Sequence, residues 1–311
     1  MTVLGPIEAA DLGTTLVHEH VMADFIGAAE TGPHRYNKDE VIKVVLPYLL
    51  KVKEAGCNTL VECTATFLGR DAELAKRLAE ESGMHILTNT GNYAALGGKF
   101  VPEYAETESA RELADRWIYE AENGIEGTGI FPGLIKIGVD EGPLLPIGRK
   151  LLEASARAHL ETGLSISGHT GDGVAALEEL DILKKNGVDP SAFRWVHAQN
   201  EKDKEFHLKA AKMGAYIEFD GIRADSVAEH VEFVKFMKEN DFLRQTLISQ
   251  DAGWYSVGEE RGGDFTPYTM IFDLFIPALR NEGFTSREVD QLLIANPRES
   301  LLIRVRKHKG S

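Results

Sequence analysis

The stretch from residue 133 to residue 171 contains, in order, GLIKIGVD (133–140), GRKLLEASARAHLETG (148–163) and GLSISGHTG (163–171). The first and third segments are short apolar runs typical of buried strands, and the middle segment has its apolar residues at helical spacing. The helical segment stops at Gly163, which suits the left-handed turn that follows many helices. This order predicts a strand, a helix and a second strand, the repeating unit of a parallel α/β fold.

The same alternation extends along the whole chain. Eight apolar runs predict strands: TTLVHEH (14–20), NTLVECTA (58–65), HILTNTGNY (85–93), GLIKIGVD (133–140), GLSISGHTG (163–171), FRWVHAQN (193–200), AYIEFDG (215–221) and TLISQDAG (246–253). Helical patterns lie between and after them, at 39–56, 71–83, 109–124, 148–163, 173–187, 203–214, 268–283 and 286–305. The strand count, and the absence of a G-x-G-x-x-G motif after the first strand, favour a (β/α)8 TIM barrel over a doubly wound open sheet. No linker-like segment divides the chain, so we predict one domain over 1–311.

The composition restricts the partners and the compartment. The formal charge is −15, from 34 Lys and Arg against 49 Asp and Glu, so nucleic acid is not an expected partner. No apolar run is long enough to span a membrane, and the N-terminus lacks the features of a leader peptide. Cys57 and Cys63 are expected to be buried free thiols. We therefore expect a soluble, cytoplasmic protein that does not bind membranes.

Residues that can bind metal recur at the ends of the predicted strands. They are His18 and His20 in the first strand, Lys136 in the fourth, His169 in the fifth, His197 in the sixth and Asp251 in the eighth. Residues two apart on a strand point to the same face, so His18 and His20 can both turn inward while Glu19 points away. Imidazole and carboxylate ligands suit zinc or a similar ion, and four histidines with an aspartate exceed the needs of one open site. Two divalent ions are therefore predicted.

Lys136 does not fit this set in its ordinary form. An ammonium group beside two dications is repelled and has no lone pair to donate. Lys136 has to be neutralised or modified to belong there, and otherwise it is a surface lysine.

At this point the sequence resembles the phosphotriesterase and phosphotriesterase-like lactonase family of the amidohydrolase superfamily. The resemblance covers nearly the whole chain, and the segments that carry it are VLGPIEAADLGTTLVHEHV (3–21), GLIKIGVDEG (133–142), GHTGDG (168–173), VHAQNE (196–201), ISQDAG (248–253) and FIPALRNEGFTSREVDQLLIANPRES (275–300). By this resemblance, His18, His20 and Asp251 are ligands of the more buried metal. His169 and His197 are ligands of the more exposed one.

The resemblance also implies the chemistry of the centre. Lys136 matches the lysine that carries a carboxylate formed with CO2, and this modification turns a cation into a bridging anion. The two ions, with zinc expected first and manganese, cobalt or iron as alternatives, would be bridged by N6-carboxylated Lys136 and by a hydroxide that acts as the nucleophile. Asp251 is the candidate catalytic residue that accepts the proton of this nucleophile. A homodimer is the assembly that family relatives suggest.

Substrate specificity is expected in the loops after the strands, at 22–37, 94–108 and 254–267. We predict substrate contacts from Tyr93, Arg223, Trp254 and Tyr255. The chain departs from the lactonase pattern after the seventh strand, because Gly221 and Ile222 follow Asp220 where lactonases typically have Arg and Tyr. Arg223 is displaced by two positions.

Three functions follow from these residues. The first is a lactonase or carboxylic ester hydrolase with phosphotriesterase activity as a side reaction. The second is a dedicated phosphotriesterase (aryldialkylphosphatase). The third, from a different class, is a non-catalytic metal-binding or regulatory protein that keeps the barrel. For the two enzymes the partner is a small ester, lactone or organophosphate substrate.

Overall fold

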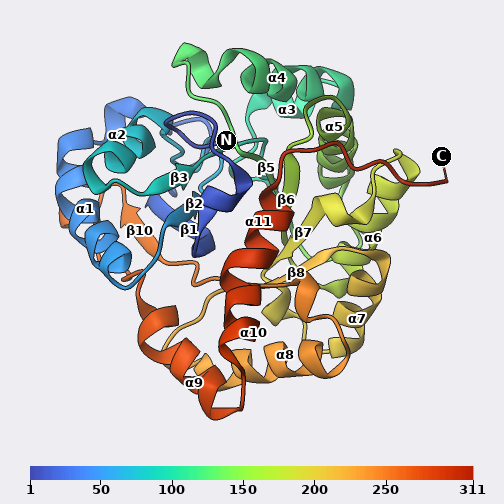
Figure 1. The fold of residues 1–311 in the computed structure, drawn as a ribbon. Helices are drawn as coiled ribbons and strands as arrows, with labels where there is room; N and C mark the ends of the chain where they lie inside the picture. Colours follow the sequence, from blue (N-terminus) through green and yellow to red (C-terminus); the bar gives the residue numbers. More distant parts are fainter. Residues whose placement is uncertain (311) are drawn as a thin grey trace.

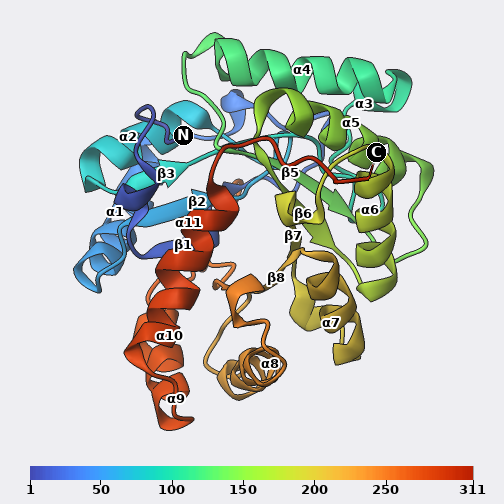
Figure 2. The ribbon, with the colours of Figure 1, turned by 45° about the vertical axis from the view of Figure 1, so that its right-hand side comes forward.

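The fold was obtained as a computed structural model that describes residues 1–310. A ring of parallel strands lies inside a layer of helices (Figures 1 and 2). The strands are β1 (Thr15–Ala23), β2 (Thr59–Glu62), β3 (His85–Leu87), β4 (Asn89–Thr90), β5 (Leu134–Val139), β6 (Ser165–Thr170), β7 (Phe193–Val196), β8 (Tyr216–Phe219), β9 (Thr246–Ile248) and β10 (Gly253–Ser256).

The strands close into a barrel although their backbone ladders form two sheets, β10-β1-β2-β3 and β4-β5-β6-β7-β8-β9. Only Thr88 separates β3 from β4, so these two strands together form the third of the eight predicted strands. We call each of these eight units of the barrel wall a stave. At the other junction, the His18 amide donates to Ser249 Oγ (2.9 Å) and the Asp251 amide donates to the His18 carbonyl (3.1 Å). These bonds join the end of β9 to β1. The predicted (β/α)8 barrel is therefore confirmed.

Helices follow the strands around the outside. They are α1 (Lys38–Glu54), α2 (Ala72–Ser82), α3 (Glu103–Thr107), α4 (Ala110–Asn123), α5 (Pro146–Thr162), α6 (Gly173–Lys185), α7 (Lys204–Met213), α8 (Val227–Glu239), α9 (Ile276–Asn281), α10 (Ser286–Asp290) and α11 (Asn296–Leu301). Local signals set their ends: Ser109 and Glu112 form a capping box at the start of α4, and Gly163 has a left-handed conformation after α5.

The structure differs from the predicted helices in three places, the first being the short α3, which lies in the predicted loop 94–108. Helix α8 was not among the predicted segments. The closing segments are interrupted by π-helical turns at Ile271–Phe275 and Gln291–Ala295, each followed shortly by a proline, Pro277 or Pro297. Proline has no amide hydrogen to donate, so the regular helical ladder cannot continue through it unchanged. The last helix ends at Leu301, short of the predicted residue 305.

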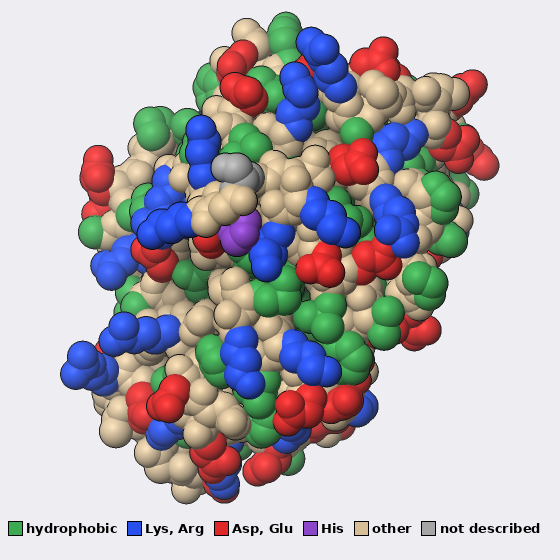
Figure 3. Space-filling view, turned by 90° about the vertical axis from the view of Figure 1, so that its right-hand side faces the viewer, with side chains coloured by type: hydrophobic (Ala, Val, Ile, Leu, Met, Phe, Trp, Pro, Cys, Tyr) green, Lys and Arg blue, Asp and Glu red, His purple; other side chains and the backbone are tan. Residues whose placement is uncertain are grey.

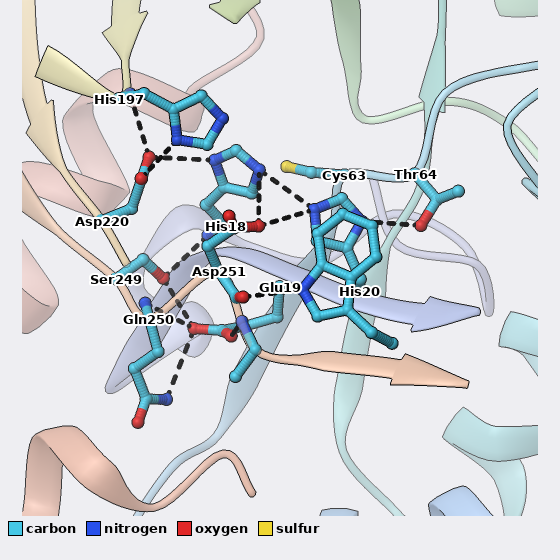
Figure 4. Close-up of polar contacts among 12 residues, drawn as sticks. His18, Glu19, His20, Cys63, Thr64, His197, Asp220, Ser249, Gln250 and Asp251 are labelled. Atoms are coloured by element: carbon cyan, nitrogen blue, oxygen red, sulfur yellow. Dashed lines mark hydrogen bonds and ion pairs between the residues drawn. The ribbon is translucent and has the colours of Figure 1, made fainter. Parts of the chain in front are cut away.

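An irregularity in β1 prepares the site. The pairing of β1 with β2 shifts register between Leu16 and Glu19. Val17 packs in an apolar cluster with Val61, Leu87 and residues of other strands, whereas His18 points toward His20 at the upper end of the barrel (Figure 4). A bulge of this kind re-aims side chains. As a result, Val17 packs in the core while its neighbour His18 faces the candidate ligands.

The surface and the helices add two observations. On the face that contains the C-terminus, basic and acidic side chains are interspersed (Figure 3). None of the helices in the described chain is long and apolar enough to cross a membrane.

Candidate metal centre

Three predicted ligands converge at the end of the barrel formed by the C-terminal ends of the strands. The Nε2 atoms of His18 and His20 are 3.2 Å apart, and Asp251 Oδ1 lies 3.0 Å from His20 Nε2 and 3.7 Å from His18 Nε2. Both imidazoles are buried, while the Asp251 side chain is 21% exposed. Their nitrogen and oxygen atoms are close enough together to share one ion, as Figure 4 shows. We call His18, His20 and Asp251 the first group.

Hydrogen bonds orient the two histidines. His20 Nδ1 lies 2.8 Å from Thr64 Oγ1, and the Thr64 hydroxyl donates to the Met22 carbonyl. Because the Thr64 hydroxyl donates its only proton to Met22, it can only accept a hydrogen bond from His20 Nδ1. The proton of the His20 ring is then on Nδ1, and the lone pair of Nε2 stays free. His18 Nδ1 faces two acceptors, Glu218 Oε1 at 3.1 Å and Asp220 Oδ2 at 3.2 Å. Both rings therefore direct Nε2 toward Asp251, as a metal site requires.

Glu19 holds the backbone that carries Asp251. Its carboxylate accepts hydrogen bonds from Ser249 Oγ (2.8 Å) and from the amides of Gln250 (3.0 Å) and Ala252 (2.7 Å). Asp251 itself has φ +50°, and Gly253 has φ +103° and lies so close to the His20 carbonyl that no Cβ would fit. Glu19 points away from the ligands, as strand alternation predicted. The sequence had suggested no definite role for it.

The second group consists of His169, His197 and Lys136. The rings of His169 and His197 meet edge to face with centroids 4.3 Å apart. His197 follows β7 with a left-handed φ of +62°, and Asp220 anchors both its backbone amide (3.1 Å) and its Nδ1 (2.5 Å). His18, His197 and Asp220 also lie within ligand distance of one another. Because Asp220 faces the Nδ1 atoms of both histidines, we interpret it as the residue that orients them.

The environment of Lys136 fits the proposed modification. Its Nζ is buried and has no hydrogen-bond partner among the described residues. A free ammonium is costly in such a place. A carboxylated lysine would instead present oxygen ligands to ions held by the neighbouring histidines. The residues present therefore fit a two-ion centre.

Charges within the centre shift several pKa values. Burial, together with the charges of His18 and Lys136, lowers the pKa of His20 to about 4, although its contact with Asp251 opposes this. Burial and the charges of His197 and Lys136 hold the pKa of His169 well below its ordinary value. Burial would raise the pKa of Asp251, but the close contact with His20 and the charge of His18 lower it. These shifts favour neutral imidazoles at His20 and His169 and an anionic Asp251, the forms that bind metal. Burial would lower the pKa of His18, but the nearby Asp220 outweighs this effect and the pKa is raised well above its ordinary value, so an ion would have to displace its proton.

Aromatic side chains line one side of the centre. Trp254 stacks on His20 with centroids 3.7 Å apart, and Phe25 stacks on Trp254 at 5.8 Å. Phe25 contacts Phe100 (6.3 Å), and Phe100 contacts Tyr93 (6.1 Å). Tyr93 meets His169 edge to face at 5.0 Å. We call Trp254, Phe25, Phe100 and Tyr93 the aromatic arc, because they connect the first group to the second.

Local backbone features place two members of the arc. The Tyr93 ring occupies the space beside Gly138, where a Cβ would lie 2.4 Å from the ring. Trp254 has φ +73°, rare for a bulky residue. Its indole Nε1 donates to the Asp251 carbonyl (2.8 Å).

The other predicted substrate residues differ in position. Arg223 Nη2 approaches the Asp251 carbonyl at 3.4 Å, so it lies beside the first group. Tyr255 lies in the core beside Trp254, and its contact with substrate stays a prediction. Successive residues of a strand point to opposite faces, and next to Trp254 the Tyr255 ring packs into the hydrophobic core against Gly262.

Sequence reasoning did not assign site roles to Thr64, Glu218, Asp220, Phe25 and Phe100. A signal existed for Glu218 and Asp220, since alternation along the seventh predicted strand places both on one face. Phe25 and Phe100 lie in loops, where no periodicity indicates direction.

Comparison with known proteins gives consistent matches over the chain. A sequence model of the phosphotriesterase family matches residues 1–301. The phosphotriesterase homology protein of Escherichia coli is 32% identical over 289 residues, covering 92% of this chain and 96% of that protein. The aryldialkylphosphatase of Saccharolobus solfataricus is 27% identical, covering 94% of this chain and 96% of that enzyme.

A solved structure shares the fold. A mutant of a PTE-like lactonase from Deinococcus radiodurans superposes with a TM-score of 0.87 at 27% identity, covering 97% of this chain and 99% of that one.

Proposed function

The chain belongs to the phosphotriesterase family and is a metal-dependent hydrolase of that family, and we propose that it is a lactonase or carboxylic ester hydrolase with phosphotriesterase activity as a side reaction. The observation that carries the proposal is the aromatic arc beside two groups of metal ligands. The ligands supply hydrolytic chemistry, and the arc selects the substituent next to the bond that is broken.

Two divalent ions would be held by the residues already described. The first group would hold one ion, His169 and His197 the other, and carboxylated Lys136 would connect them. When bound, such ions polarise the substrate oxygen and lower the pKa of water. Zinc is the first candidate because imidazole and carboxylate ligands suit it.

Asp251 would act on the proton of the attacking water. Its carboxylate is anionic and partly exposed, and its backbone is fixed by Glu19 and by the Trp254 indole. An anionic group held in place beside the reacting water is suited to general-base catalysis. Asp251→Asn keeps the shape but removes the charge, so we expect kcat to fall by about 10²–10⁴-fold, measured on protein with verified metal content. Activity close to that of the wild type would exclude Asp251 as the base.

The arc and Arg223 suggest the substrate. Trp254 and Phe25 offer aromatic faces to an acyl chain or an aryl group, and Phe25 is 46% exposed. Arg223 and Trp254 approach the same Asp251 carbonyl, at 3.4 Å and 2.8 Å, so Arg223 lies beside the Trp254 end of the arc. A substrate at this end would place an apolar substituent on the arc and an oxygen-rich group toward Arg223.

A dedicated phosphotriesterase is the second candidate. The related aryldialkylphosphatase supports it, and an aryl leaving group would also suit the arc. A non-catalytic metal-binding protein is the third, and a metal and activity assay separates it from the enzymes.

The deciding experiment is a hydrolysis screen of the metal-loaded protein. Substrates would include γ- and δ-lactones, acyl-homoserine lactones, phosphorylated sugar lactones, aryl esters and paraoxon-like triesters, ranked by kcat/KM. The proposal predicts that lactones or esters with apolar substituents rank first and that a chelator abolishes turnover. A triester ranked first would favour the dedicated phosphotriesterase. An inert protein that binds metal would favour the third candidate.

A further inference from the structure

A charged residue lies inside the barrel below the ligands. Arg194, on β7, is fully buried, and none of its guanidinium nitrogens has a hydrogen-bond partner among the described residues. In the strand register, Lys136 of β5 is level with Ser167 of β6, and Ser167 is level with Arg194. The guanidinium therefore belongs to the same interior region as Lys136.

One carboxylate connects Arg194 to a metal ligand. Arg194 Nη1 lies 4.0 Å from Glu218 Oε2, and the other oxygen of Glu218 lies 3.1 Å from His18 Nδ1. Arg194 and Glu218 are both fully buried, so water does not screen the pair. His18 Nε2 on the far side of the ring faces His20 and Asp251.

Filling the barrel does not require this arrangement. Desolvating a guanidinium and a carboxylate costs several kcal/mol per ion, and an apolar pair of similar volume would fill the space at least as well. The pair can set an orientation, because a cation 4.0 Å from Glu218 Oε2 favours the rotamer in which the other oxygen, Oε1, faces His18 Nδ1. Groups that receive the second nitrogen of a metal-binding histidine fix its orientation and tautomer.

We infer that Arg194 is a positioning residue, which acts through Glu218 to hold His18 with its Nε2 directed at the first metal position. The inference rests on the proposed function, since it assigns His18 to a metal. It adds a residue on β7, three positions before His197, to the groups that orient the candidate ligands.

The test is the zinc affinity of Arg194→Met, which keeps an unbranched side chain but removes the guanidinium and its charge. We expect zinc to bind about 10- to 100-fold more weakly at the first group, as for loss of other partners of metal ligands, measured by competition with a chromophoric chelator. Arg306→Met is the matched control, because Arg306 is also a buried arginine but donates to the Glu299 carbonyl, away from the ligands. The control is expected to lose stability and keep its zinc affinity.

A double-mutant cycle tests the route through Glu218. If Arg194 acts through Glu218, the loss in zinc affinity for Arg194→Met with Glu218→Gln is smaller than the sum of the single losses. Fully additive losses would overturn the inference, as would wild-type zinc affinity in Arg194→Met or an equal loss in the Arg306 control. If Arg194→Met does not fold, Arg194→Gln replaces it with the same expectations. If the wild-type protein binds no zinc, both the proposed function and this inference are overturned. If the wild type binds zinc and the Arg194 variants bind it equally well, only this inference is overturned.

Discussion

The two ligand groups differ in how the protein holds them. In the first group, each histidine has a partner at Nδ1 and the Asp251 backbone is fixed by Glu19. In the second, His197 is anchored by Asp220, but the His169 side chain has only ring contacts with His197 and Tyr93 among the described residues, and Lys136 Nζ has no partner. The first group is pre-organised by hydrogen bonds. The second would depend more on the predicted modification of Lys136 and on the ions themselves.

The largest effect is expected from removing Lys136, the predicted connection between the two ligand groups. Lys136→Ala should reduce the metal content from about two ions per chain to about one, because the first group keeps its own ligands and partners. Activity should fall with it. Elemental analysis and kcat on the same samples measure both, and added short carboxylic acids should restore part of each by replacing the lost carboxylate. Two tightly bound ions in this variant would show that Lys136 is not the bridge.

A smaller loss is expected when a hydrogen bond of the first group is removed. Thr64→Val deletes the hydroxyl that accepts from His20 Nδ1 and keeps the shape of the side chain. Metal affinity at the first group should weaken by about 10- to 100-fold, measured by chelator competition. Unchanged affinity would mean that pre-organisation is not what distinguishes the first group.

The arc should affect substrate choice more than metal binding. Trp254→Ala removes the indole ring that stacks on His20 and Phe25. We expect kcat/KM to fall by about 10-fold for substrates with an apolar substituent. This fall is equivalent to roughly 1–2 kcal/mol of transition-state stabilisation. Short-chain substrates should lose less. Tyr119→Ala, at an exposed aromatic residue of α4, is the control and should behave as the wild type. A uniform loss across all substrates would indicate that Trp254 positions His20 and does not select substrates.

The smallest effect on activity, although not on stability, is expected at Glu179, which contacts the strand that carries His169. Burial raises the pKa of Glu179 to about 8. The hydrogen bond that Thr170 donates to the Glu179 carboxyl group opposes this rise but does not cancel it. The folded state therefore keeps this proton at pH values where the unfolded chain has lost it, so its contribution to the free energy of unfolding is present below about pH 4.5 and is lost as the pH rises to about 8. Glu179→Gln mimics the neutral acid and should flatten this decline by a few kcal/mol at most. Urea titrations at several pH values measure the slope, and identical slopes in both proteins would exclude the raised pKa.

Much of the fold was predictable because its signals are local. The period of apolar residues indicated all eight staves, and terminal glycines indicated several helix ends. The closing helices were harder to predict, since the π-helical turns before Pro277 and Pro297 interrupt patterns that otherwise continue. Helix α8 was not predicted, although it lies between two predicted strands.

The candidate ligands were predictable because strand alternation and barrel topology together place strand ends at one site. His18, His20, His169, His197 and Asp251 lie together there, and Lys136 lies among them. The direction of Tyr255 was not predicted: neighbouring residues of a strand face opposite ways, so Tyr255 packs in the core while Trp254 stacks on His20.

By itself, the sequence determined the alternation of strands and helices and the residue types at the strand ends, since both follow from short-range periodicity. Only the tertiary structure decided which groups orient those ligands. His18 meets Glu218 across 200 residues of chain, and Phe25 meets both Trp254 and Phe100 from a separate loop. Such contacts exist only after the barrel has closed and the loops have packed over it, because the pairings depend on stave order and on irregular backbone that no local period encodes.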